Sequence, residues 1–366
     1  MTKREYMNEL RDTLSEINFA EASELLEDYE NHFQAGIAEG KSEEDIIKEL
    51  GTVEELAEEL KGFAEEKEQK TESRKEASVV ETGTDADWEN IDISLISADV
   101  IVRMAEDDKM HMEYKNDQKL WSKNKMTFIG YQEGNTFYAE EKRIGHSTAS
   151  FSGSSKLYVW VPKKCKNIIV NGKSGDITVQ NVIDLRKMNI KIMSGDISIQ
   201  GGKIDTLHCD TMSGDVMIRN HESERLEAKS LSGDVKIEGT TYLRGDFSST
   251  SGDVTVDELA KGSDASIQSV SGDVSVVVRD TACGDIKSTS GDVELIIEKE
   301  CTGFEIRTKG TDFGFPSGSK GSRWGEMRIR SHEEIPYIDG AYCYGDRNAK
   351  FSMSTVSGDL SVKHYS

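Results

Sequence analysis

The sequence has no hydrophobic run long enough to cross a bilayer. A membrane helix needs about 20 consecutive, mostly apolar residues, and no stretch of the 366 residues approaches that length. The chain also opens at Met1 directly into acidic, helix-patterned sequence without a signal-peptide pattern. We therefore expect no integral membrane segment and a cytoplasmic location. Peripheral association with the cell envelope, or surface exposure by a non-classical route, stays open as an alternative.

Cysteine is scarce and unpaired. An odd number of cysteines that lie far apart in the chain encodes neither a disulfide framework nor a CxxC metal knuckle. This pattern fits a reducing compartment. The five are Cys165, Cys209, Cys283, Cys301 and Cys343.

An excess of basic residues is also missing. The chain holds 68 acidic against 45 basic residues, which gives a formal charge of -23. A nucleic-acid backbone would be repelled by such a protein unless its basic residues were sharply concentrated. We therefore expect no nucleic-acid partner.

Catalytic motifs are absent as well. The seven histidines are scattered, and the sequence contains no HExxH pair, Walker loop, GxGxxG turn or GxSxG elbow. His208 and Cys209 are adjacent, but neighbours on a strand point to opposite faces, so Cys209 is expected to be a buried structural thiol. We predict that the protein is not an enzyme and holds no cofactor or metal. A polysaccharide-active β-helix enzyme is the remote alternative, because solenoids can carry carboxylate clusters in a groove.

Residues 1–63 have apolar positions at helical spacing and predict a small all-α domain. Four helices are implied, and Ser42 followed by Asp45 forms a cap signal before one of them. Residues 1–62 hold 18 acidic and 6 basic side chains. This acidic domain is expected to bind a protein partner, although a helical bundle that merely caps or oligomerises is the alternative.

A string of motifs in this region resembles the bacterial HAAS signalling domain. The matching stretches are Glu5-Tyr6, Asp28-Tyr29-Glu30, the segment 40–46 (GKSEEDI) and Leu50-Gly51-Thr52. Val53 departs from the pattern, which usually has proline there. The resemblance implies a role in bacterial signalling or transcriptional control rather than catalysis.

Residues 64–87 are mostly charged and polar, with little to bury. We interpret them as a linker between the helical domain and the remainder of the chain, 88–366.

A short repeat fills most of this second region. The tripeptide Ser-Gly-Asp recurs seven times at nearly constant spacing, and Ser97-Ala98-Asp99 resembles a decayed copy near its start. A fixed period of about 19–20 residues is typical of a solenoid. The seven copies begin at Ser174, Ser194, Ser213, Ser232, Ser251, Ser271 and Ser290, and an eighth begins at Ser357.

Apolar residues alternate after each aspartate, as in Val235 and Ile237, which is the pattern of a half-buried strand. A second inward row is expected four residues before each serine. Its members are Val170, Ile190, Cys209, Ala228, Phe247, Ile267 and Ile286. Each period thus supplies two short strands that cannot bury their own apolar face, so stacking of coils is required. The sequence predicts a mainly β fold: a single-stranded β-solenoid with a small N-terminal all-α domain.

The glycines and aspartates of the repeat are expected to be structural turn residues. Glycine tolerates a sharp corner, and aspartate can bond to nearby backbone there. Binding of a divalent cation by the aspartate row is the alternative. These turn residues are Gly175, Asp176, Gly195, Asp196, Gly214, Asp215, Gly233, Asp234, Gly252, Asp253, Gly272, Asp273, Gly291, Asp292, Gly358 and Asp359.

The regions that flank the regular coils are less uniform. Residues 88–101 and 156–170 predict strands, whereas 110–143 is irregular apart from a hairpin signal at 133–135. Residues 303–350 are rich in glycine and aromatic residues, and predict a long insertion in the last coil. This insertion could form a binding surface or cover the open end of the solenoid.

The strand Val159-Trp160-Val161-Pro162, the SGD coils and the closing segment 355–362 (TVSGDLSV) resemble the bacterial putative-adhesin repeat family, a β-solenoid domain of unknown function. That resemblance implies a link to the cell envelope and its stress responses. We therefore expect a non-enzymatic scaffold or interaction protein of bacterial envelope signalling. A surface adhesin or ligand-binding module is the alternative.

Overall fold

The computed structural model of the protein describes residues 2–16, 26, 29–30, 33–34, 37, 41–50, 52–53, 79–81, 88–107, 109–116, 125–144, 155–308, 327–331, 335–338 and 340–365. The chain divides into two compact units. One comprises residues 1–77 with 119–122, and the other comprises 78–118 with 123–366.

The first unit is helical. Its described residues include helices α1 (Lys3–Glu16) and α3 (Glu43–Leu50), and the rest of the four expected helices lies largely outside them. The expected cap is present, because the backbone N–H of Asp45 donates to Ser42 Oγ at 3.2 Å. The buried core of this unit contains Tyr6, Met7, Leu10, Phe33, Ile46 and Val53.

The second unit is built from strands. Within the described residues, they form one sheet of 13 strands and one of 14. The first, sheet A, contains β1 (Val79–Glu81), β3 (Asp99–Met104), β4 (His111–Asn116), β7 (Ser155–Val161), β9 (Ile177–Gln180), β11 (Ile197–Gln200), β13 (Val216–Arg219), β15 (Val235–Glu238), β17 (Val254–Val256), β19 (Val274–Val278), β21 (Val293–Ile297), β23 (Met327–Ser331) and β27 (Leu360–His364).

Sheet B provides the opposite wall of the unit. It contains β2 (Asn90–Leu95), β5 (Lys125–Glu133), β6 (Thr136–Ile144), β8 (Asn167–Ser174), β10 (Leu185–Ser194), β12 (Ile204–Ser213), β14 (Glu222–Ser230), β16 (Thr241–Ser249), β18 (Asp264–Ser269), β20 (Cys283–Ser288), β22 (Gly303–Thr308), β24 (Tyr337–Ile338), β25 (Ala341–Gly345) and β26 (Ala349–Ser354).

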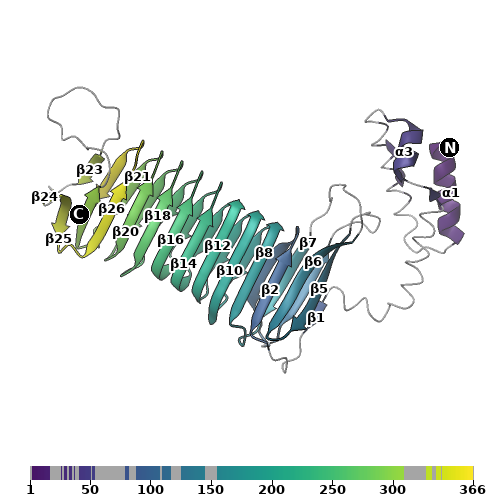
Figure 1. Ribbon diagram of the computed structural model, residues 1–366, viewed down its shortest axis with the longest axis horizontal. Coiled ribbons are helices and arrows are strands. Elements are labelled where there is room, and N and C mark those ends of the chain that lie inside the picture. The colour runs from purple at the N-terminus through teal and green to yellow at the C-terminus, as the bar shows by residue number, and fades with distance from the viewer. Residues whose placement is uncertain are drawn as a thin grey trace. The chain divides into compact units, whose positions relative to one another are not determined.

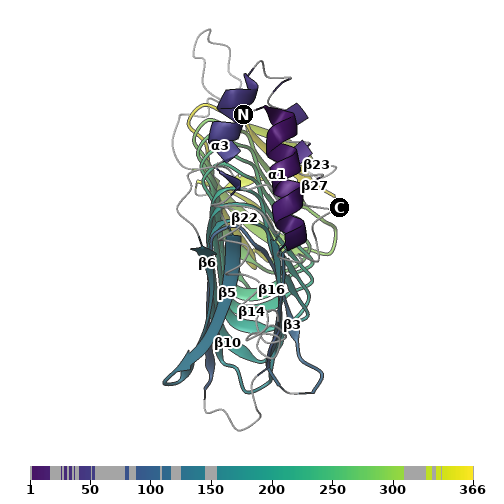
Figure 2. The ribbon, with the colours of Figure 1, turned by 90° about the vertical axis from the view of Figure 1, so that its right-hand side faces the viewer.

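Each SGD period supplies one strand to each sheet. The strand before the motif joins sheet B, the strand after it joins sheet A, and equivalent strands of successive coils pair in parallel. Figure 1 shows these strands stacked along a rod, and Figure 2 shows the two sheets as facing walls. The mainly β, solenoid-type fold predicted from the sequence is confirmed.

The core of the rod is a single thin layer between the two sheets. Alternation places Val235 and Ile237 inward, and both are fully buried. The second expected row is buried as well, from Val170 through Phe247 to Ile286. One continuous apolar cluster runs from Trp88 to Val362, so every coil is stabilised by the coils on both sides of it.

At the N-terminal end of the rod, the order of strands in space differs from their order in the chain. Coil β2–β3 lies between coil β8–β9 on one side and strands β6 and β7 on the other. The expectation of an irregular segment at 110–143 is wrong, because β4, β5 and β6 lie there. The hairpin signal is confirmed: β5 and β6 pair in antiparallel fashion around Gly134, whose φ is 56°.

The C-terminal end shows the same inversion. Strand β26 lies between β20 and β22, and β27 lies between β21 and β23. The last SGD coil therefore does not end the rod, as its position in the sequence suggests. Strands from the inserted region lie beyond it instead.

One strand falls in the region that the sequence assigns to a linker. Residues 79–81 form β1, which pairs in antiparallel fashion with β4. Val79 and Val80 are β-branched and suit a pleated strand. The other residues of 64–87 lie outside the described part of the chain.

Candidate functional site

The aspartates of the SGD turns form a hydrogen-bonded ladder along the rod. In each coil the aspartate N–H donates to Oδ1 of the aspartate in the coil before it, over 2.8–3.0 Å. The decayed motif contributes too, because Asp99 accepts the N–H of Asp176. The ladder runs through Asp99, Asp176, Asp196, Asp215, Asp234, Asp253, Asp273, Asp292 and Asp359.

The glycines of the same turns pack directly on one another. A Cβ added to Gly233 would lie 1.9 Å from the carbonyl oxygen of Gly214, and one added to Gly358 would lie 2.0 Å from that of Gly291. Such distances exclude any side chain. The long chain segment between the seventh and eighth SGD motifs therefore does not interrupt the stacking of the turns.

A second ladder consists of buried hydroxyl groups two residues before the SGD serine in six of the eight coils. Ser249 Oγ donates to the Gly233 carbonyl at 2.8 Å and accepts the Gly252 N–H at 2.9 Å. The hydroxyls that bond to a glycine carbonyl of the preceding coil are those of Thr211, Ser230, Ser249, Ser269, Ser288 and Thr355. Sequence reasoning missed this row, although the pattern [ST]-x-S-G-D displays it.

A buried carboxylate continues this bonding at the N-terminal end. Glu141 of β6 is 4% exposed, and its Oε2 accepts the N–H groups of Ile96, Ser97 and Ala98 at 2.7–3.1 Å. Its other oxygen accepts the hydroxyl of Tyr114 at 2.8 Å. Glu141 thus provides the hydrogen-bond acceptor for the turn of coil β2–β3. At this end of the rod β6 occupies the position of a preceding coil. No sequence pattern marked this residue.

The aromatic residues of the inserted region lie partly over the C-terminal end. The rings of Tyr344 and Phe304 stack at 5.5 Å, and the His364 ring lies 4.6 Å from that of Tyr344. Tyr337 is 48% exposed and lies 4.8 Å from Tyr342. Phe313, Phe315 and Trp324, which the sequence also places in this region, lie outside the described residues.

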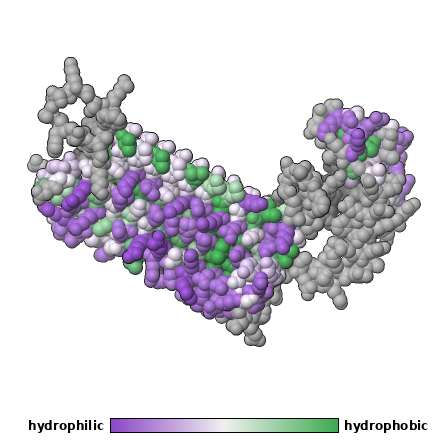
Figure 3. All heavy atoms as spheres, in the orientation of Figure 1, coloured by the Kyte–Doolittle hydropathy of each residue, from purple (hydrophilic) through white to green (hydrophobic). Residues whose placement is uncertain are grey.

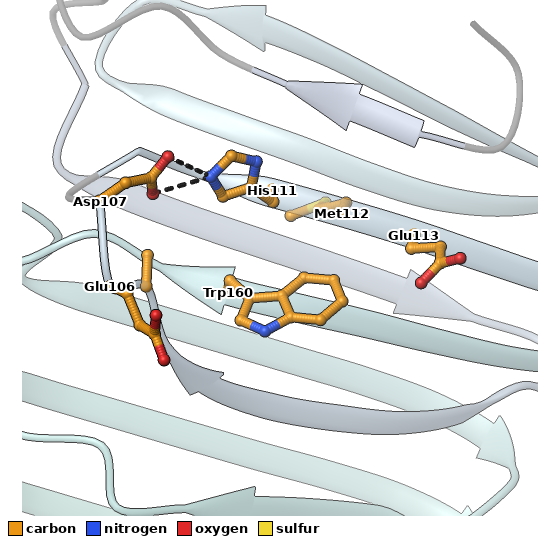
Figure 4. A pocket seen from close by; sticks show the side chains of 7 residues that line it. Glu106, Asp107, His111, Met112, Glu113 and Trp160 are labelled. Carbon is orange, nitrogen blue, oxygen red and sulfur yellow. Dashed lines mark hydrogen bonds and ion pairs between the residues drawn. The ribbon is translucent and has the colours of Figure 1, made fainter. Parts of the chain in front are cut away.

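An open cavity of about 520 Å³ lies where β3, β4 and β7 meet. Its lining is Ala105, Glu106, Asp107, His111, Met112, Glu113 and Trp160. In the view of Figure 4 the indole of Trp160 is seen broadside, with the carboxylates of Glu106 and Glu113 on its two sides. The sequence predicts only that Trp160 lies on a strand, and it does not predict this cavity.

The polar groups of the cavity are mostly acidic. His111 Nε2 lies 2.8 and 2.9 Å from the two carboxylate oxygens of Asp107. This hydrogen bond is the main reason that the pKa of Asp107 lies below its ordinary value. Among the described residues, no group of three or more His, Cys, Asp or Glu side chains is placed to hold a metal ion.

The adjacent residues His208 and Cys209 point to opposite faces of β12. Cys209 is fully buried in the inward row, and burial raises the pKa of its thiol. Its neighbour His208 faces outward and lies 3.0 Å from a Glu227 carboxylate oxygen. The two side chains therefore do not form a joint ligand pair.

Two family matches cover most of the chain. Toastrack DUF4097 matches residues 88–311, and HAAS matches residues 5–59. No curated protein shows a significant match.

Solved structures also show likenesses. A crystal structure described as a "putative lipid binding protein" from Parabacteroides distasonis has 14% identity and a TM-score of 0.44, covering 78% of this chain and 95% of that one. A "putative adhesin" from Bacteroides fragilis has 11% identity and a TM-score of 0.38, covering 78% of this chain and 97% of that one.

The family assignment rests on the Toastrack match, which spans more than half of the sequence. The chain belongs to the Toastrack DUF4097 family and carries a HAAS domain at its N-terminus.

Proposed function

We propose that this protein is a non-enzymatic interaction scaffold of bacterial cell-envelope signalling or stress response. The helical HAAS domain binds a protein partner, and the Toastrack rod holds a long, regular surface in a fixed shape. The observation that carries this proposal is that the polar groups of the turns form hydrogen bonds with other groups of the repeat. The SGD carboxylates and the hydroxyls before them bond to neighbouring coils.

The ladders make the rod a stiff element. Each coil contributes a buried apolar layer, a stacked glycine corner and side-chain bonds to the next coil. Stability in such an array is shared between neighbouring repeats. In this role the aspartates of the row are structural turn residues, as the sequence predicts, and they do not form a cation site.

The outer surface of the rod repeats from coil to coil. In most coils the residue just before the SGD serine is exposed, and it is often apolar, as at Met193, Met212, Leu231, Val270 and Val356, which are 45–53% exposed. Figure 3 shows hydrophilic residues over most of the visible face of the rod, and hydrophobic ones at intervals along one edge. A repeated surface of this kind suits contact with an extended partner.

The helical domain favours a partner with basic groups. Glu43, Glu44 and Asp45 are exposed in the first turn of α3, and 18 acidic side chains occur within residues 1–62. Complementary charge raises the rate at which partners meet and disfavours the wrong ones.

A ligand-binding or adhesive module is the second candidate. The cavity around Trp160 favours it, because ligand sites are concave, with an apolar or aromatic surface and a few polar groups. Among the described residues, no helix is long and apolar enough to cross a membrane.

The two candidates differ in where the protein is found. We would treat intact cells of the source with a protease, repeat the treatment after lysis, and fractionate the cells into cytosol and membrane. The scaffold proposal predicts protection in intact cells and digestion after lysis. Digestion in intact cells would overturn it in favour of the adhesive module, and depolymerisation of a polysaccharide by the purified chain would overturn both.

A further inference from the structure

The cavity beside Trp160 lies on the outer face of sheet A. Register places His111 of β4 opposite Trp160 of β7, and Trp160 beside Arg103 of β3. Side chains at paired positions share one face of a sheet. The indole, the imidazole and the acids of the turn after β3 therefore converge above the sheet rather than within the core.

The lining combines an aromatic surface with negative charge. Trp160 is half-buried, and its ring stacks on Tyr158 at 6.0 Å. Glu106, Asp107 and Glu113 supply three carboxylates, and the described lining includes no lysine or arginine. An indole face attracts cations through its quadrupole, more strongly than a tyrosine or phenylalanine ring does.

The lysine of β4 and the arginine of β3 are held by other groups, whereas Lys109 in the turn between these strands is exposed. Lys115 Nζ lies 3.3 Å from Glu113 and 4.9 Å from the centre of the Tyr158 ring. Arg103 Nε donates to Gln180 at 2.8 Å. Glu106 is exposed and makes no ion pair with any residue that the structure describes. Within the part of the chain that the structure describes, the cavity thus presents one carboxylate without an ion pair next to an aromatic face.

We propose that this cavity binds an organic cation, an alkylammonium or guanidinium group, over the indole of Trp160 and beside Glu106. Its volume of about 520 Å³ falls within the roughly 300–1,000 Å³ of small-molecule sites. The formal charge of -23 draws cations toward the protein and repels anions. The proposal goes beyond the scaffold role and does not depend on it.

The test follows Trp160 by fluorine NMR in the full-length chain labelled with 5-fluorotryptophan. The Trp160 signal is assigned by its loss in Trp160→Phe. Spermidine and N-acetyl-arginine amide serve as cationic probes, and N-acetyl-glutamine amide is the uncharged control. We expect a saturable shift of the Trp160 signal with at least one cationic probe and none with the uncharged control.

Paired variants separate a site from general attraction to an acidic protein. Glu106→Gln should weaken binding at least threefold. Asp257→Asn removes the same charge from an exposed position next to β17 and should leave binding unchanged. Neither substitution removes a buried group, so both variants should fold.

The outcomes are decisive in either direction. Binding of spermidine identifies a free polyamine as a source of the cation, and binding of the arginine derivative alone identifies a protein side chain. The proposal is overturned by the absence of a saturable shift, by an equal shift with the uncharged control, or by equal weakening in Asp257→Asn.

Discussion

The central coils and the two ends of the rod differ in how chain order relates to spatial order. In the centre, β12 pairs with β10 and β14, the equivalent strands of the coils before and after it. At the ends, strands from later or earlier segments lie outside the terminal coils, and antiparallel pairs such as β5–β6 and β22–β25 finish the sheets. Each coil pairs with the next, but the outer edge of a terminal coil leaves backbone N–H and C=O groups unpaired. Residues from outside the repeat are therefore needed to cover the two ends.

The turn chemistry shows the same contrast. Central turns bond to an aspartate and to a hydroxyl of neighbouring coils. At the N-terminal end, Glu141 of an inserted hairpin bonds to the turn 96–98 instead. Gly172 and Ile192 occupy the hydroxyl position in the first two regular coils. The bonding partners thus change from residues of the repeat to a single residue outside it.

The largest effect is expected from a charge placed in the central core. Val235→Asp puts a carboxylate at a fully buried position of β15 and should cost about 4 kcal/mol or more, since no partner can neutralise it there. Thr255→Asp, on the outer face of the adjacent β17, is the matched control. Thermal unfolding followed by circular dichroism should separate the two. A higher melting temperature for Val235→Asp than for Thr255→Asp would mean that the faces of the strands are reversed, and equal melting temperatures would contradict the inward placement of Val235.

A smaller but localised effect is expected at the N-terminal end. Glu141→Ala leaves three backbone N–H groups without an acceptor and should cost about 3 kcal/mol. Its neighbour Glu140 pairs with Lys142 on the outer face, and Glu140→Ala should change stability little. Hydrogen exchange should accelerate in residues 88–104 of the Glu141 variant and not in β15. Uniform acceleration along the rod would contradict a local role.

In a central turn, replacing the buried serine before the SGD motif should cost more stability than replacing the exposed serine of the motif itself. Ser249→Ala removes a buried hydroxyl with two hydrogen bonds and should cost about 1–2 kcal/mol. Ser251→Ala alters the exposed serine of the SGD motif itself and should stay within about 0.5 kcal/mol. Urea unfolding of the two variants measures the difference. If Ser251→Ala proves the more costly, the hydroxyl ladder does not stabilise the rod.

The smallest effect concerns pH. Burial lowers the pKa of His221 below its ordinary value of 6.5, and its Nδ1 lies 2.9 Å from the Gly201 carbonyl. Because the unfolded chain takes up this proton more readily, the contribution of His221 is fully present above pH 6.5 and is lost as pH falls below it. His221→Asn should therefore reduce the fall in melting temperature between pH 7.5 and 5. An unchanged pH profile would show that His221 does not titrate in this way.

The regular part of the rod was predictable because its signals are local and repeated. The spacing of the SGD motifs defined the period, and alternation defined the inward row at positions such as Val235 and Phe247. The decayed motif is also recognisable in the sequence, and its Asp99 joins the aspartate ladder. Seven copies of one pattern provide enough repetition for the turn and both strands to be recognised.

The ends and the cavity were not predictable in this way. The role of Glu141 depends on a contact with residues far away in the chain, and no second copy of that arrangement exists in the described chain to reveal it. The same holds for Trp160, which meets His111 only because β4 folds back on β7. Long-range pairing that occurs once leaves no periodic signal in the sequence.

The coils of the rod should be equivalent units that can be removed one at a time. Deletion of residues 213–231 removes one complete period and brings Asp234 into register with Asp196. We predict a folded, shorter rod with a cooperative unfolding transition and a correspondingly smaller maximum dimension by small-angle X-ray scattering. Loss of the β-sheet circular dichroism signal in this variant would contradict it.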